Sequence, residues 1–88
     1  HGTGLPRGKR WPYDSGTHVP LIVRWPGKIK PGEKLSQPVS LLDLAPSVLD
    51  AADVPRPQHL QGIPFLGPNA AKREFCFSAR DRHDTGYD

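Results

Sequence analysis

Apolar positions gather in three short runs, separated by long polar stretches rich in Gly and Pro. The first run extends from Val19 to Trp25 and is interrupted only by Pro20 and Arg24. Its length and β-branched content predict a strand that is buried on both faces, as in parallel sheets. Pro20 can lie at the start of such a strand without removing a ladder hydrogen bond. Pro26 and Gly27 then end it.

The second run predicts a helix over residues 40–52. Ser40 is followed three residues later by Asp43, which makes a plausible capping box with Asp in place of Glu. Pro46 removes one backbone donor, so an alternative start has Asp43 itself as the cap. Asp53 and Pro55 are expected to end the helix. Six apolar residues recur on one face at helical spacing, and this pattern predicts that the face is buried: Leu41, Leu44, Ala45, Val48, Leu49 and Ala52.

The third run, Phe75 to Ser78, predicts a second short strand, with Cys76 packed between Phe75 and Phe77. Residues 1–18, 28–38 and 54–74 lack apolar periodicity and contain turn-forming Gly and Pro, which is typical of loops. The order strand, loop, helix, loop, strand therefore indicates an α/β unit.

Length and composition limit what this chain can build. Its 88 residues allow one small domain at most, and 11 Pro with nine Gly indicate a loop-rich segment. Two or three short apolar elements enclose little core, so we expect the segment to need neighbouring residues in order to fold. The chain starts at His1 rather than Met, which suggests a piece of a longer protein.

The charge and the cysteine count exclude several classes. A formal net charge of +3 favours anionic partners but does not separate nucleic acid from sulfated sugar. One Cys excludes an internal disulfide and a Cys-rich zinc site. No run of about 18 apolar residues is present, so no membrane span is predicted.

Candidate chemistry lies near the start of the chain. Lys9 stands between Arg7 and Arg10 and is followed by Trp11 and Tyr13. A lysine is a compact charge that can stabilise a sulfate or phosphate oxygen directly. A solvated basic loop is the alternative reading. Cations beside aromatics also suit nucleic acid, but no recognised nucleic-acid module is matched. Trp11 is interpreted as a packing residue.

The spacing of particular residues carries a family resemblance. Six residues fall in order on a motif of Lys, aromatic, acid, Gly, basic residue and Pro before a strand that ends in Trp-Pro-Gly: Lys9, Tyr13, Asp14, Gly16, His18 and Pro20. His1-Gly2 looks like the end of a metal-binding motif, and Asp43 to Pro46 is similar to a later helix. Together these segments resemble the sulfatases, and the likeness covers nearly the whole chain.

The resemblance implies a fold and three site residues. Residues 1–88 would be a carboxyl-side portion of a sulfatase catalytic domain, α/β in class and part of an alkaline-phosphatase-like fold with a central β-sheet flanked by helices. Lys9 would bind the sulfate and act in catalysis, and His1 would ligate a metal, Ca²⁺. His18 stands where relatives often carry Arg; it would contact the substrate or serve a structural role. Arg80 begins a charged tail that either reaches a sugar or is a solvated charge run.

The family's nucleophile is expected outside this segment. It is a formylglycine made from Cys or Ser in a Cys-x-Pro-x-Arg or Cys-x-Ala-x-Arg motif. Cys76 and Arg80 have that spacing, but Ser78 occupies the middle position and the segment follows the lysine motif instead of preceding it. Cys76 is therefore interpreted as a packing residue.

The resemblance also implies an activity. The intact enzyme would hydrolyse sulfate esters of a small molecule or a carbohydrate, using formylglycine and calcium. It would be periplasmic or extracellular and would not bind nucleic acid. A phosphatase or phosphonate hydrolase of the same superfamily is the first alternative. A non-catalytic, basic, polyanion-binding segment is the second.

Overall fold

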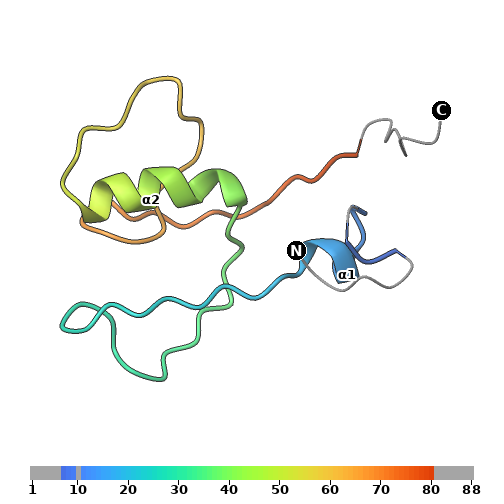
Figure 1. Ribbon diagram of the computed structural model, residues 1–88, viewed down its shortest axis with the longest axis horizontal. Helices are drawn as coiled ribbons and strands as arrows, with labels where there is room; N and C mark the ends of the chain where they lie inside the picture. The colour runs from blue at the N-terminus through green and yellow to red at the C-terminus, as the bar shows by residue number, and fades with distance from the viewer. Residues whose placement is uncertain (1–6, 10, 81–88) are drawn as a thin grey trace. The chain divides into compact units, whose positions relative to one another are not determined.

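The computed structural model describes residues 7–9 and 11–80. Within them the chain forms a single-turn helix α1 (Asp14–Thr17), a 3₁₀ turn η1 (Leu41–Asp43) and a helix α2 (Leu44–Ala51). The described residues belong to two compact units. The first unit includes the described residues up to 33 together with residues 78–80, and the second unit is residues 34–77. Figure 1 shows α2 in the second unit, with the chain that follows it turning back alongside the helix.

The predicted capping box is confirmed. The Ser40 hydroxyl accepts a hydrogen bond from the Leu42 N–H (3.3 Å), and the Ser40 N–H donates to Oδ2 of Asp43 (3.0 Å). Ser40, not Asp43, therefore begins the helical segment through its side chain. Pro46 is the third residue of α2, close to the helix start, where a missing N–H costs little. Asp53, in a left-handed conformation at φ 56°, follows the end of the helix.

The buried side of η1 and α2 is largely polar, with Pro46 as a buried apolar residue, and this differs from the sequence-based expectation. Asp43 and Ser47 are 1% and 2% exposed, whereas Leu41 and Val48 are 76% and 66% exposed. The polar residues lie on one helical face because they are four residues apart. The chain that returns alongside the helix brings backbone N–H groups to this face, and these groups need acceptors, which apolar side chains cannot supply.

The α/β prediction is wrong for the described residues, since ranges 7–9 and 11–80 contain no strand. Residues 19–25 carry the apolar, β-branched run, but Ile22 in its centre is 91% exposed. A strand exists only when a second segment completes its hydrogen-bond ladder, and local sequence does not provide that segment. The same holds for residues 75–78. Phe77 and Cys76 are exposed, so the expected packing of Cys76 is also wrong.

In the part of the chain that the structure describes, Pro46 is buried, but no Ala, Val, Ile, Leu or aromatic side chain is. The arrangement of the second unit therefore rests largely on hydrogen bonds and one ion pair, described below. None of the described helices has the length and apolar character needed to cross a membrane.

Candidate functional site

Lys9 lies in a tight turn. The Trp11 N–H donates a hydrogen bond to the Gly8 carbonyl oxygen at 3.1 Å, which places Lys9 at the second position of a four-residue turn. Gly8 is buried and Lys9 is exposed. The turn therefore presents the ammonium group at the surface, where it can meet an anion. Its role as sulfate ligand stays a prediction.

Helix α1 packs against this turn through Ser15 and Gly16. The Ser15 hydroxyl donates to the Arg7 carbonyl oxygen at 2.6 Å, and Arg7 has a left-handed φ of 60°. Such a conformation is unfavourable for a residue with a Cβ and persists when its surroundings impose it. A Cβ at Gly16 would overlap the carbonyl oxygens of Gly8 and Trp11. Glycine is thus required at position 16 for α1 to approach the Lys9 turn this closely.

Two arginines lie over the rings of the two aromatic residues that follow Lys9 in the sequence. The guanidinium carbon of Arg80 is 3.7 Å from the Trp11 ring centroid, and that of Arg7 is 5.5 Å from the Tyr13 centroid. The two rings are tilted by 35° with centroids 6.1 Å apart. We call Arg7, Tyr13, Trp11 and Arg80 the cation–aromatic array. Trp11, interpreted from sequence as a packing residue, is 41% exposed and is the centre of this array.

His18 is the residue that follows α1. Its N–H donates to the Asp14 carbonyl oxygen at 2.7 Å, and its Nδ1 is 3.6 Å from Oδ1 of Asp14. These two side chains are 81% and 90% exposed, so the pairing is weakened by solvent. No hydrogen bond or ion pair among the described residues joins His18 to Lys9. His1, the predicted metal ligand, lies outside the described residues.

A second polar cluster is centred on Asp43 and extends beyond the capping box that the sequence predicts. Its carboxylate accepts hydrogen bonds from the Ile63 N–H (2.9 Å) and from Nε (2.9 Å) and Nη2 (2.6 Å) of Arg73, besides that from Ser40. Burial is the largest single influence and opposes ionisation. The hydrogen bonds from Arg73, Ile63 and Ser40 and the positive charge of Arg73 together outweigh it, so the pKa of Asp43 is lowered.

Besides Asp43 of η1, two residues of α2 bind the returning chain. The Ser47 hydroxyl donates to the Asp43 carbonyl oxygen (2.6 Å) and accepts from the Phe65 N–H (2.9 Å). The Asp50 carboxylate accepts from the backbone N–H (2.9 Å) and Nδ2 (2.6 Å) of Asn69. Asp43, Ser47 and Asp50 thus act as acceptors for a loop that would otherwise leave its N–H groups unpaired. Their role is structural.

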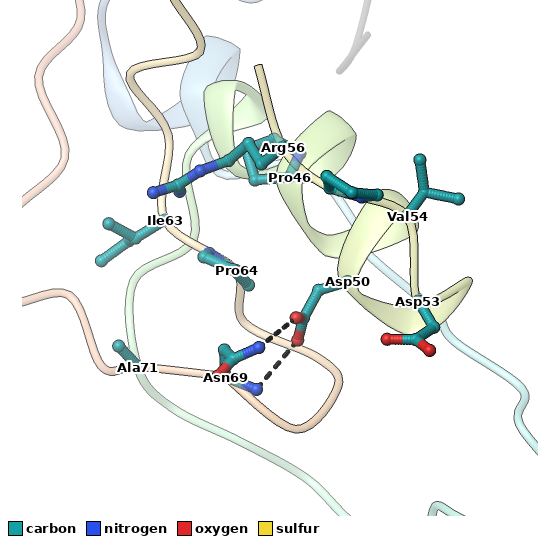
Figure 2. A pocket seen from close by; sticks show the side chains of 10 residues that line it. Pro46, Asp50, Asp53, Val54, Arg56, Ile63, Pro64, Asn69 and Ala71 are labelled. Atoms are coloured by element: carbon teal, nitrogen blue, oxygen red, sulfur yellow. Dashed lines mark hydrogen bonds between the residues drawn. The ribbon is translucent and has the colours of Figure 1, made fainter. Parts of the chain in front are cut away.

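A cleft of about 490 Å³ lies between α2 and this returning loop (Figure 2). Two of its charged residues already have partners: Asp50 binds Asn69, as the dashed lines show, and Nη1 of Arg56 donates to the Gly62 carbonyl oxygen at 2.7 Å. Neither Lys9 nor His18 lines it. Lys9 is exposed, and its ammonium group forms no ion pair among the described residues. The Lys9 turn is therefore the better candidate for an anion site.

Comparison with known proteins decides the family. A family model described as N-sulphoglucosamine sulphohydrolase, C-terminal, matches residues 7–80. The chain belongs to the sulfatase family. The match includes the Lys9 turn, the cation–aromatic array and the Asp43 cluster. The resemblance inferred from the spacing of Lys9 to Pro20 is thereby confirmed.

Individual relatives agree with this assignment. The sulfatase segment is 38% identical to the ulvan-active sulfatase of Formosa agariphila over 89 residues, which is 100% of this chain and 15% of that protein. It is 46% identical to human arylsulfatase K over 54 residues, 61% of this chain and 10% of the relative. It is 41% identical to the extracellular sulfatase SULF-1 homolog of Drosophila melanogaster over 63 residues, 72% of this chain and 6% of the relative.

The sulfatase segment therefore spans at most 15% of the length of these relatives. No solved structure matches it.

Proposed function

We propose that the full protein containing this segment hydrolyses sulfate esters and that Lys9 binds the sulfate group of the substrate. Membership of the sulfatase family supports the reaction. The observation that carries the role of Lys9 is its place in a turn fixed by Gly8, Trp11 and Gly16, which leaves its ammonium group at the surface. A residue that binds substrate needs this combination of fixed backbone and accessible head group.

The chemistry requires a positive charge near the ester. When the bond between sulfur and the ester oxygen breaks, negative charge develops on the leaving oxygen. A cation already held at that place stabilises the charge without rearranging at the moment of reaction. We assign this task to the Lys9 ammonium group, and we assign its positioning to α1 through Ser15 and Gly16.

Calcium and formylglycine remain proposals that rest on the family resemblance. Within residues 7–9 and 11–80, no group of three or more His, Cys, Asp or Glu side chains could hold a metal ion. The described residues therefore do not form a calcium site by themselves, and we derive no step through the metal. Calcium prefers several oxygen ligands, so His1 would need carboxylates from elsewhere in the protein.

The substrate class and the compartment are also proposals. A modest positive charge and an exposed lysine suit sulfated small molecules or sulfated carbohydrates. One relative carries the name extracellular sulfatase, and this name supports a periplasmic or extracellular location.

Comparing two esters of one alcohol tests the proposed reaction. We expect the full protein to hydrolyse 4-nitrophenyl sulfate with a higher kcat/KM than 4-nitrophenyl phosphate, measured by release of nitrophenol. A preference for the phosphate would favour the phosphatase alternative. Turnover of neither ester, together with binding to polyanions that weakens as salt rises, would favour a non-catalytic binding segment.

The isolated segment of 88 residues is expected to show no turnover of either ester in the presence of calcium. Apart from Pro46, none of its described apolar side chains is fully buried, so the hydrophobic term that usually stabilises a fold is small. The nucleophile is also expected outside it. Sulfate release and far-ultraviolet circular dichroism measure activity and helix content together. Calcium-dependent turnover by the isolated segment would contradict this prediction.

A further inference from the structure

Lys9 and the cation–aromatic array together have more positive groups than one sulfate ester needs. Arg7, Lys9 and Arg80 are all exposed and belong to the same compact unit. A single sulfate monoester offers one anionic group, and Lys9 is proposed to bind it. The two arginines then remain without a function in the reaction.

Contact with an aromatic ring restrains both arginines, Arg80 more closely than Arg7. A guanidinium group that lies over a ring, as Arg80 does over Trp11 at 3.7 Å, is attracted by the ring through its face. Its five N–H donors lie in the guanidinium plane, so they stay available for sulfate or carboxylate oxygens. Because the stacking already restricts the side chain, binding an anion costs less conformational entropy than it would for a free arginine.

Arg7, the second arginine of the array, is restrained by its backbone as well as by an aromatic ring. Arg7 is held at φ 60° by the hydrogen bond from Ser15, and its side chain is 5.5 Å from the Tyr13 ring centroid. The Lys9 turn lies between Arg7 and Trp11 in the sequence. The two arginines thus accompany the proposed sulfate ligand on the same local structure.

We propose that the cation–aromatic array is a binding site for additional anionic groups of a sulfated polysaccharide, so that the protein binds a sulfated polymer more tightly than a small aryl sulfate. Arg7 and Arg80 bind sulfate or carboxylate groups on sugar units next to the one whose ester contacts Lys9. Trp11 and Tyr13 hold the two guanidinium groups in place. This inference rests on the proposed function, because Lys9 defines the reacting unit.

Binding of dextran sulfate to the full protein, measured by titration calorimetry at fixed salt, tests the array. We expect Arg80→Ala and Arg7→Ala each to weaken binding about tenfold, as expected when a charge-assisted hydrogen bond is lost. Arg80→Lys keeps the charge but lacks the planar fork, and it is expected to recover only a small part of the affinity. Lys28→Ala removes one exposed positive charge outside the array and is the matched control, with a change of about twofold or less.

Several outcomes would overturn the proposal. Equal losses for Arg80→Ala and Lys28→Ala would show that only net charge matters. Full recovery by Arg80→Lys would exclude stacked geometry, and absence of wild-type binding would exclude the site. If Arg7→Ala and Arg80→Ala weakened binding of a single-stranded oligonucleotide as much as binding of dextran sulfate, the array would be a general polyanion surface and not a site for a sulfated polysaccharide. Thermal unfolding of each variant reports whether it is folded.

Failure of the proposed function gives a different pattern. A wild-type protein that binds dextran sulfate with the expected variant profile, but does not hydrolyse 4-nitrophenyl sulfate, would contradict the sulfatase proposal while supporting the array as a binding site.

Discussion

Replacing Lys9 with alanine in the full protein is expected to lower kcat/KM for 4-nitrophenyl sulfate about 100- to 1000-fold, the loss typical of removing one group that stabilises developing charge. The expectation follows from the exposed ammonium group at the second position of the Gly8–Trp11 turn. Initial rates over a range of substrate concentrations separate an effect on kcat from one on KM. Because the proposed role is strongest in the transition state, most of the loss is expected in kcat.

Two variants serve as controls for Lys9→Ala. Lys28→Ala removes the same charge from another exposed position and is expected to change kcat/KM by about twofold or less. Lys9→Arg keeps the charge on a longer, planar head group and is expected to recover only part of the activity. Near-normal turnover by a folded Lys9→Ala variant would remove the basis of the proposed mechanism.

Replacing Asp43 with alanine is expected to destabilise the full protein by about 3–5 kcal/mol. Asp43 is 1% exposed and binds Arg73 through two hydrogen bonds, so its removal leaves a partly buried guanidinium and the Ile63 N–H without their acceptor. Equilibrium unfolding in urea measures the change. Glu74→Ala removes an exposed carboxylate next to Arg73 and is the control, with an expected change within about 0.5 kcal/mol.

A double-mutant cycle checks the assignment to this pair. If Asp43 and Arg73 act together, the loss in Asp43→Ala/Arg73→Ala is expected to be smaller than the sum of the two single losses. Strict additivity would show that the ion pair at 2.6 Å does not couple the two residues energetically.

The lowered pKa of Asp43 predicts how the stability depends on pH. The carboxyl group is more acidic in the folded state than in the unfolded state, where its pKa is about 3.9. Its contribution is therefore fully present above about pH 5, decreases as pH falls through the unfolded pKa, and is lost below the folded pKa. The difference in unfolding free energy between wild type and Asp43→Asn should thus be constant from pH 7 to about pH 5 and then shrink toward acid. A difference that grows toward low pH would contradict the assignment.

Local sequence predicted the start of the helical segment well. The Ser40–Asp43 capping box involves groups three residues apart, so the same short segment contains both donors and both acceptors. The second function of Asp43 could not be inferred this way, because Arg73 is 30 residues away and Ile63 is 20 residues away. The apolar pattern also failed to give the buried face of α2, since that face is set by the loop that returns to it.

The Lys9 site shows the same division. The order of Lys9, Tyr13, Asp14, Gly16, His18 and Pro20 carried the resemblance to the sulfatases, which the family comparison confirmed. The requirement for Gly16 became visible only when α1 was seen against the carbonyl oxygens of Gly8 and Trp11. Arg80 could not be connected to Trp11 by sequence spacing, because nearly the whole chain lies between them.

The sequence by itself determined the family, the candidate lysine and the helix with its cap, because each depends on residues only a few positions apart. The tertiary structure alone decided that residues 19–25 form no strand in the described part, that η1 and α2 bury a largely polar side, and that two arginines lie over the rings of Trp11 and Tyr13. These features depend on which distant segment comes to lie against a given residue. Hydrogen-bond ladders, burial and stacking all need that second partner, and local periodicity contains no information about it.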